Sequence, residues 1–121
     1  MRLAAALGAL ILVSAAAQAA ANAKNGEIVF GRCAQCHTAA KGGGNGLGPN
    51  LFGVSGRKAA ALPGFPYSPA LKNANITWTD ANLHKWFENP MKMVPGTRMA
   101  FAGVRRSQDI DDLIAYLKTQ K

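Results

Sequence analysis

The sequence predicts a small all-α domain built from about three main helices and long loops. Two segments, near residues 79–89 and from residue 107 onwards, have apolar residues at helical spacing and begin at residues that commonly cap helices. Stretches rich in glycine and proline lie between the helical segments, and no alternating pattern indicates a strand. With 121 residues, the chain is long enough for one domain.

The N-terminal residues have the pattern of a secretory signal peptide. Arg2 precedes an apolar run that is followed by several small residues. The alternative is a membrane anchor, which needs about 20 apolar residues, and the strongly apolar part is shorter than that. We therefore expect a leader, 1–23, and a domain, 24–121. Three cleavage positions fit the small-residue pattern: after Ala19, after Ala21 or after Ala23.

A short helix is expected over residues 25–31, and it leads into a pair of cysteines. Gly26, Phe30 and Cys33 fall on one face of this helix. Gly26 has no side chain, so another helix can approach closely there. The alternative is a plain helix start that contains glycine, a weak helix former.

Two further helices are expected in the second half of the chain. Thr79 is a good N-cap for the first of them, and Pro90 stops it. Ser107 is expected to cap the last helix. The apolar faces are formed by Leu83, Trp86 and Phe87 in the first helix, and by Ile110, Leu113, Ile114 and Leu117 in the last.

The segment Cys33-Ala34-Gln35-Cys36-His37 is the most specific chemical signal in the chain. Two thiols at this spacing, followed directly by histidine, are typical of covalent c-type haem attachment. Each sulfur forms a thioether with one vinyl group, and His37 is placed to bind the iron. We therefore expect one haem c, bound through Cys33 and Cys36. A haem also gives the long loops, residues 41–48 and 62–69, a surface to wrap around.

Three other uses of the cysteines are alternatives to haem attachment. A thioredoxin-like redox pair needs a βαβ pattern, which is not visible around this motif. A zinc site needs four ligands, and only His84 could join the two thiols and His37. A disulfide across so short a loop would stabilise a domain poorly.

A second axial ligand to the iron has four candidates in the sequence: His84, Met91, Met93 and Met99. His84 lies off the apolar face of its helix, which favours a surface position. Met91 and Met93 closely follow a helix stop at Pro90. Met99 follows a Pro-Gly turn that could direct it inward, and Phe101 could then shield the haem edge from water.

Several further stretches occur in the order known from one family. They are Cys33 to Thr38, Gly48 to Gly53, Gly56 to Lys58, Pro63 to Phe65, Ile76 to Trp78, Glu88 to Pro90, Val94 to Gly103, and Asp112 to Leu117. In these stretches the chain resembles class I cytochromes c, both the mitochondrial type and its bacterial periplasmic relatives.

The resemblance implies roles for individual residues. It makes His37 and Met99 the axial ligands, and it assigns the carbonyl of Pro49 to the second ring nitrogen of His37. It also implies that the first helix crosses the last near Leu113 and Tyr116. Residues expected around the haem are Arg57, Tyr67 and Trp78 near the propionates, Phe101 at the exposed edge, and Trp86. Trp86 stands where the mitochondrial type usually has tyrosine, and Leu71 where it often has asparagine.

The charge of the chain points to acidic partners. Lys and Arg number 14 against 6 Asp and Glu, a formal charge of +8, and only Arg2 leaves with the leader. Such a surface suits nucleic acid, anionic membranes or acidic proteins. An exported protein rarely meets nucleic acid, and no lysine run resembles a nucleic-acid tail. We expect docking on acidic surfaces of redox proteins, with transient contact to the membrane surface.

These observations predict a soluble, monomeric, single-electron carrier of the periplasm rather than an enzyme. Expected donors are a cytochrome bc complex or a dehydrogenase. Expected acceptors are a terminal oxidase, a reductase or a photosynthetic reaction centre. Two alternatives stay open: a haem enzyme or gas sensor with a displaceable sixth ligand, and a membrane-anchored relay subunit that keeps its leader.

Overall fold

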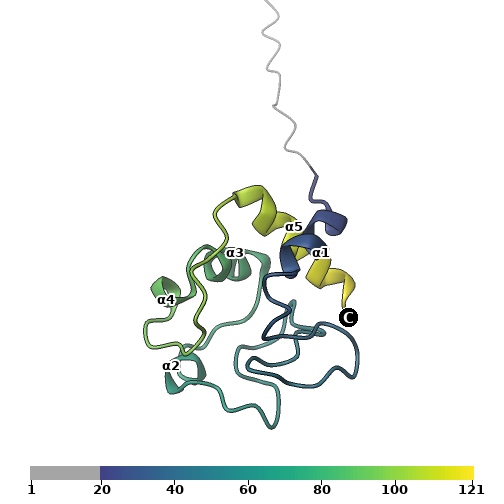
Figure 1. Cartoon of the computed structure of the whole chain (residues 1–121). Helices are drawn as coiled ribbons and strands as arrows, with labels where there is room; N and C mark the ends of the chain where they lie inside the picture. Colours follow the sequence, from purple (N-terminus) through teal and green to yellow (C-terminus); the bar gives the residue numbers. More distant parts are fainter. Residues whose placement is uncertain (1–19) are drawn as a thin grey trace, which may run out of the picture.

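The computed structural model describes residues 20–121, which contain five helices (Figure 1). In chain order these are α1 (Ala23–Phe30), α2 (Pro69–Lys72), α3 (Asp80–Glu88), α4 (Pro90–Met93) and α5 (Ser107–Thr119). Among the described residues, β pairing is limited to an isolated antiparallel bridge between Lys58 and Thr77. The predicted all-α fold is therefore confirmed, with α1, α3 and α5 as its main helices. The predicted leader lies outside the described residues, except for its last four positions.

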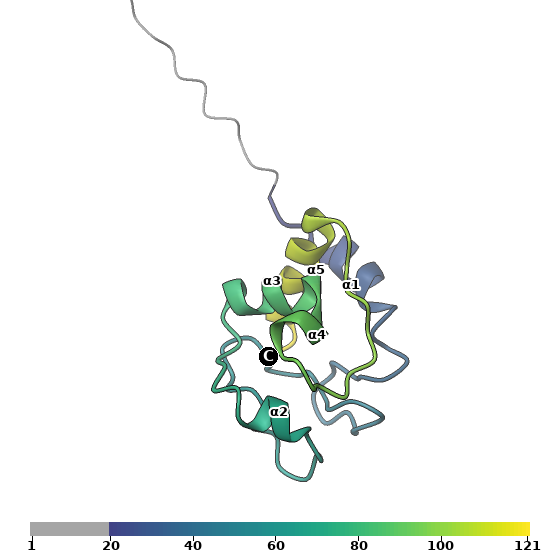
Figure 2. The same ribbon diagram turned by 90° about the vertical axis from the view of Figure 1, so that its left-hand side faces the viewer.

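Helices α1 and α5, from opposite ends of the described chain, cross in close contact (Figures 1 and 2). Gly26 makes this contact possible, because a Cβ atom there would overlap the backbone carbonyl of Asp112. The same atom would lie 2.8 Å from Cβ of Tyr116. One turn further on, the rings of Phe30 and Tyr116 pack with their centroids 5.4 Å apart. The predicted crossing of the first and last helices is confirmed.

Helix α1 begins two residues earlier than the sequence predicted, because Asn22 caps it. The side-chain oxygen of Asn22 accepts hydrogen bonds from the backbone N–H groups of Lys24 and Asn25. These groups have no partner inside the helix, so the cap satisfies two otherwise unpaired donors.

One predicted cap is confirmed and another is wrong. The hydroxyl of Thr79 accepts a hydrogen bond from the backbone N–H of Asn82, as expected for the N-cap of α3. Ser107, in contrast, is the first residue of α5. Arg106, with extended backbone, takes the cap position and makes no side-chain bond there. The hydroxyl of Ser107 lies instead 3.1 Å from Nε2 of His84.

Proline begins two short helices that the sequence did not predict. Pro90 ends α3 as expected, but it is also the first residue of α4, which Asn89 caps. Pro69 begins α2 in the same way, behind the cap residue Ser68. The first helical position needs no N–H donor and suits the fixed φ of proline. A proline therefore ended one helix and started the next.

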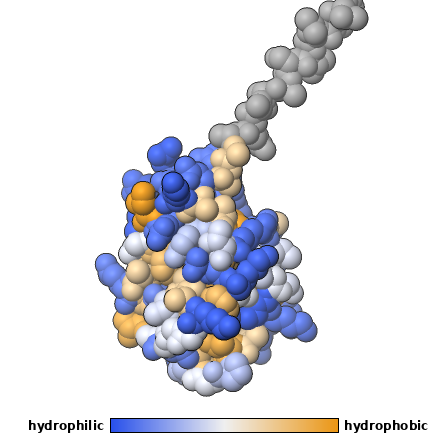
Figure 3. All heavy atoms as spheres, turned by 90° about the vertical axis from the view of Figure 1, so that its right-hand side faces the viewer, coloured by the Kyte–Doolittle hydropathy of each residue, from blue (hydrophilic) through white to orange (hydrophobic). Residues whose placement is uncertain are grey.

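The core lies between α1, α3 and α5. The predicted apolar faces are confirmed, since these side chains are all buried: Leu83, Trp86, Phe87, Ile110, Leu113, Ile114 and Leu117. The face of the molecule shown in Figure 3 is mainly hydrophilic, with hydrophobic residues scattered over it. Within residues 20–121, no helix has the length and apolar character needed to cross a membrane.

Candidate functional site

A cavity of about 780 Å³ lies between the helical core and the loops. The segment from Cys33 to His37 forms one part of its wall, and the segment from Thr97 to Phe101 forms another. Every site residue predicted from the sequence lines this cavity: Cys33, Cys36, His37, Pro49, Arg57, Tyr67, Trp78, Trp86, Met99 and Phe101. The structure therefore brings together residues that are up to 68 positions apart in the chain.

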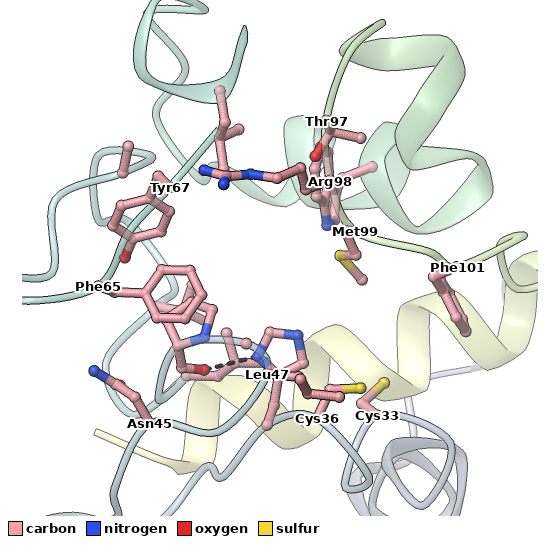
Figure 4. Close-up of a pocket in the computed structure, with 18 of the residues that line it drawn as sticks. Cys33, Cys36, Asn45, Leu47, Phe65, Tyr67, Thr97, Arg98, Met99 and Phe101 are labelled. Atoms are coloured by element: carbon pink, nitrogen blue, oxygen red, sulfur yellow. Dashed lines mark hydrogen bonds between the residues drawn. The ribbon is translucent and has the colours of Figure 1, made fainter. Parts of the chain in front are cut away.

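The imidazole of His37 is held in one orientation by the backbone. Its Nδ1 atom lies 2.7 Å from the carbonyl oxygen of Pro49 (dashed in Figure 4). A carbonyl only accepts hydrogen bonds, so Nδ1 carries the proton and donates it. Burial lowers the pKa of His37 and so favours the neutral ring, although the hydrogen bond to Pro49 acts in the opposite direction. A neutral ring with Nδ1 protonated leaves the lone pair of Nε2 free to bind a metal.

Gly48 allows the chain to pass directly against this imidazole. A Cβ atom at Gly48 would lie 2.6 Å from both ring nitrogens of His37. Only glycine fits there without displacing the ring. No role for Gly48 had been predicted from the sequence. The available signal was its place next to Pro49, since the carbonyl of that residue orients the ring.

The two cysteines lie next to each other at one edge of the cavity and are not joined by a disulfide (Figure 4). The side chain of Met99 lies apart from them and directs its sulfur into the cavity. Burial raises the pKa of Cys33 to about 11, so this thiol stays protonated at neutral pH. A redox pair of the thioredoxin type depends on a thiolate, which this environment disfavours.

The other candidate ligands lie away from the cavity. His84 contacts two carboxylates, with Nδ1 3.1 Å from Glu88 and Nε2 3.5 Å from Asp111. Met91 is exposed, and Met93 packs against the core without lining the cavity. Among residues 20–121, no group of three or more His, Cys, Asp or Glu side chains is arranged to hold a metal ion. The zinc alternative therefore lacks its ligands in this part of the chain.

Aromatic side chains form much of the remaining wall. The indoles of Trp78 and Trp86 meet edge to face, with ring centroids 5.2 Å apart, and both are buried. Tyr67 packs in the same way against Phe65, at 4.9 Å. The hydroxyl of Tyr67 accepts a hydrogen bond from the backbone N–H of Leu62. The wall is therefore apolar and held in place by ring packing.

The charged residues that line the cavity are all basic: Arg32, Arg57, Lys58 and Arg98. The guanidinium of Arg57 donates to the carbonyl oxygens of Phe52, at 3.2 Å, and Asn50, at 3.3 Å. Arg98 donates to the carbonyl oxygen of Pro66 at 2.9 Å. The backbone thus holds two of these charges in fixed positions. Basic groups beside an apolar wall suit a flat apolar ligand that has anionic groups at its edge.

The residues that line this cavity fit a haem on several independent grounds. Its volume and apolar walls suit a macrocycle, and two thiols lie at one edge. The oriented imidazole of His37 and the thioether of Met99 both line the space.

A family model, described as cytochrome c, matches residues 23–121 of the sequence. The chain belongs to the cytochrome c family.

Individual members of the cytochrome c family align with most of the chain. A cytochrome c from Gibberella zeae is 48% identical over 95 residues, which cover 78% of this chain and 90% of the relative. A cytochrome c2 from Rhodomicrobium vannielii is 46% identical over 114 residues, or 94% of this chain and 91% of the relative. The solved structure of cytochrome cH from Methylobacterium extorquens superposes with a TM-score of 0.77 at 44% identity. It covers 81% of this chain and 98% of the other.

Membership of the cytochrome c family defines the cofactor and the general role. The protein binds one haem c, covalently through Cys33 and Cys36, and functions as an electron carrier. The bound iron supplies a one-electron couple between its ferrous and ferric states.

Proposed function

We propose that His37 and Met99 are the two axial ligands and that the chain is a diffusible single-electron carrier. One observation carries this proposal: of the four candidates for the second ligand, only Met99 lines the cavity together with His37 and the cysteines. With both axial positions filled by side chains, no position is left for a substrate. Methionine also favours the reduced iron more than a second histidine would.

The neighbouring residues receive roles that follow from their contacts. Pro49 orients His37 through the hydrogen bond to Nδ1. Arg57, with Tyr67 and Trp78, is proposed to lie near the propionates, where its charge balances theirs. Trp86 extends the apolar wall from Trp78. Phe101 is half-buried and keeps water away from the haem edge.

The surface around the cavity supports docking on acidic partners. Arg32, Lys58 and Arg98 line the cavity and are also exposed, and no acidic residue joins them in the lining. This one-sided charge attracts an acidic surface to the place where electrons leave the protein. Such complexes form quickly and are weakened by salt.

Export to the periplasm completes the proposal. The leader pattern in residues 1–23 and the cytochrome c2 relative both favour a bacterial exported carrier, working as a monomer between membrane complexes. The proposed donor is a cytochrome bc complex or a dehydrogenase. The proposed acceptor is a terminal oxidase, a reductase or a reaction centre.

Met99→Ala tests the axial ligation. Axial ligands set haem potentials over a span of about 0.8 V, so we expect the midpoint potential to fall by on the order of 0.1 V or more. The vacated position should also bind carbon monoxide in the reduced protein. The matched control is Met93→Ala, because Met93 is a half-buried methionine outside the cavity. An unchanged potential in Met99→Ala would reject the assignment, and carbon monoxide binding by the unsubstituted protein would favour a gas sensor or enzyme.

The docking proposal is tested by electron-transfer rates to a purified terminal oxidase at rising salt. The Debye length falls from about 30 Å at 0.01 M to about 8 Å at 0.15 M salt. We expect the rate to fall about tenfold over that range. Arg32→Gln should lower the low-salt rate, whereas Lys121→Gln, at an exposed site outside the cavity lining, should not. Equal rates in both variants would contradict docking at the cavity mouth.

A further inference from the structure

A buried carboxylate lies where helices α1 and α5 cross, well away from the haem cavity lining. The side chain of Asp112 belongs to a residue that is only 3% exposed. It accepts three hydrogen bonds: from the backbone N–H of Asn22 at 2.7 Å, from the amide of Asn25 at 2.7 Å and from the amide of Gln108 at 2.9 Å. All three donors are neutral, so the carboxylate has partners but no matching charge.

A buried charge without a counter-charge is unusual, because removing it from water is costly. Among residues 20–121, none of the ion pairs involves Asp112. The N–H of Asn22 is the largest influence that lowers the pKa of Asp112. Arg106 contributes the smallest, through its charge alone. The strongest single partner of this carboxylate is therefore one backbone nitrogen near the start of the domain.

We propose that the leader is cleaved between Ala21 and Asn22, and that the new amino terminus becomes the counter-charge of Asp112. The inference rests on the proposed export. A leader peptidase adds water across this amide, so Ala21 leaves with a carboxylate and Asn22 keeps its nitrogen as an amine. An α-amino group has a pKa of about 7.7–8.0, so it is largely an ammonium at neutral pH. The nitrogen that already lies 2.7 Å from Oδ1 of Asp112 then carries a positive charge.

The residues before the Ala21–Asn22 bond match the cleavage pattern of leader peptidases. Leader peptidases read small residues at the first and third positions before the cut, and Ala19 and Ala21 are both small. The same rule is met by cuts after Ala19 and after Ala23, so the sequence leaves three choices. The contacts of the folded domain separate them.

A cut after Ala23 would remove contacts that the fold uses. It would delete Asn22, whose side chain caps α1 and whose carbonyl accepts a hydrogen bond from the N–H of Gly26. It would also take away the closest donor to Asp112. A cut after Ala19 would keep these contacts but leave the ammonium two residues away. Ala20 and Ala21 are exposed and form no hydrogen bond to the rest of the described chain.

The first experiment measures the intact mass of the haem-loaded protein after export to the periplasm of a bacterial host and purification from it. A chain that begins at Asn22 supports the inference. A chain that begins at Ala20 or Lys24 overturns it while leaving export intact. A retained leader overturns this inference and favours the membrane-anchored relay over the diffusible carrier, without contradicting export. Electron-transfer rates measured on the same sample report separately on the proposed function.

The second experiment tests the ion pair by comparing two haem-loaded chains, one beginning at Asn22 and one at Ala20. Denaturant unfolding at pH 7 and low salt should show the Asn22 chain to be more stable, by about fivefold or more in the unfolding constant. Asp112→Asn should bring the ratio of the two unfolding constants to about one. Asp111→Asn, at an exposed site, should leave that ratio unchanged. Equal stability of the two unsubstituted chains rejects the ion pair, and that comparison needs no substitution.

Discussion

The crossing of α1 and α5 and the loops around the cavity are stabilised in different ways. At the crossing the chain packs on itself: Leu113 is fully buried, and backbone meets backbone at Gly26. The loop side, with residues 45–68 and 97–101, faces a cavity of about 780 Å³. The helix pair is therefore specified by contacts within the chain. The loops are held by fewer packing contacts, so we expect them to depend more on the haem that they enclose.

The haem also adds apolar contacts on the loop side. When it fills the cavity, apolar wall surface is removed from water, which stabilises a fold by about 25 cal/mol per Å². Whole domains are stable by only about 5–15 kcal/mol. We therefore expect the haem to contribute to the stability of the fold as well as to electron transfer.

The largest expected effect follows from removing the haem. In the haem-free chain of Cys33→Ala/Cys36→Ala, we expect the loops to collapse and the helices to be lost with them. The cause is that α1 and α5, with 8 and 13 residues, are too short to persist alone. Far-ultraviolet circular dichroism and hydrogen exchange measure this. Protected amides confined to α1 and α5 would show instead that the helix pair is independent of the loops.

The next expected effect comes from substituting two glycines, one at the helix crossing and one just after the loop segment 97–101. Gly26→Ala forces α1 away from α5, and Gly103→Ala places a Cβ against the carbonyl of Glu88, at a φ of +109° that also disfavours alanine. Each should cost about 1–3 kcal/mol of unfolding free energy. Only Gly103→Ala, four residues from Met99, should also change the haem spectrum. Gly44→Ala is the control, because a Cβ there meets nothing within 4 Å.

Acid should weaken the helix crossing through Asp112. Its folded-state pKa is lowered, so its contribution is complete above the unfolded value of about 3.9 and is lost as pH falls through the folded value. Asp112→Asn should therefore lower the unfolding free energy by about 1.5 kcal/mol at pH 7. The difference from the unsubstituted protein should vanish in strong acid. A difference that stays constant from pH 7 down to pH 2 would contradict this linkage.

The smallest effect separates a true cap from an apparent one. Thr79→Ala removes the hydrogen bond to the N–H of Asn82 and should cost about 1 kcal/mol. Ser107→Ala removes no cap, so thermal unfolding should show a clearly smaller loss. Equal losses at the two positions would mean that Ser107 caps α5 after all.

Periodicity and local motifs predicted the helical half of the fold well. The buried faces of α3 and α5 and the cap at Thr79 followed from spacing and residue type alone. Cap positions were less certain, because several residues near a helix start can bond to it. Asn22 caps α1, for which no cap had been predicted, and Arg106 took the cap position that had been predicted for Ser107. Both outcomes depend on where the chain enters the helix, which packing against other elements decides.

The residues predicted for the site all line the cavity, but the shape of the cavity was not predicted. The motif from Cys33 to His37 indicated its own chemistry, whereas the membership of Arg57, Tyr67 and Met99 followed from resemblance to a family. Neither source predicted the close approach of Gly48 to His37, or the basic character of every charged residue in the lining. These features depend on loops whose path has no periodic signal in the sequence.

The hydrogen bond from Arg98 to the carbonyl of Pro66 has a consequence for docking kinetics. Arginine normally loses rotational freedom when it joins an interface, and that loss opposes association. Here the guanidinium is already anchored before a partner arrives. An acidic surface that docks here, as proposed, would meet a charge that is already held in one position, so Arg98 would lose little rotational freedom on association.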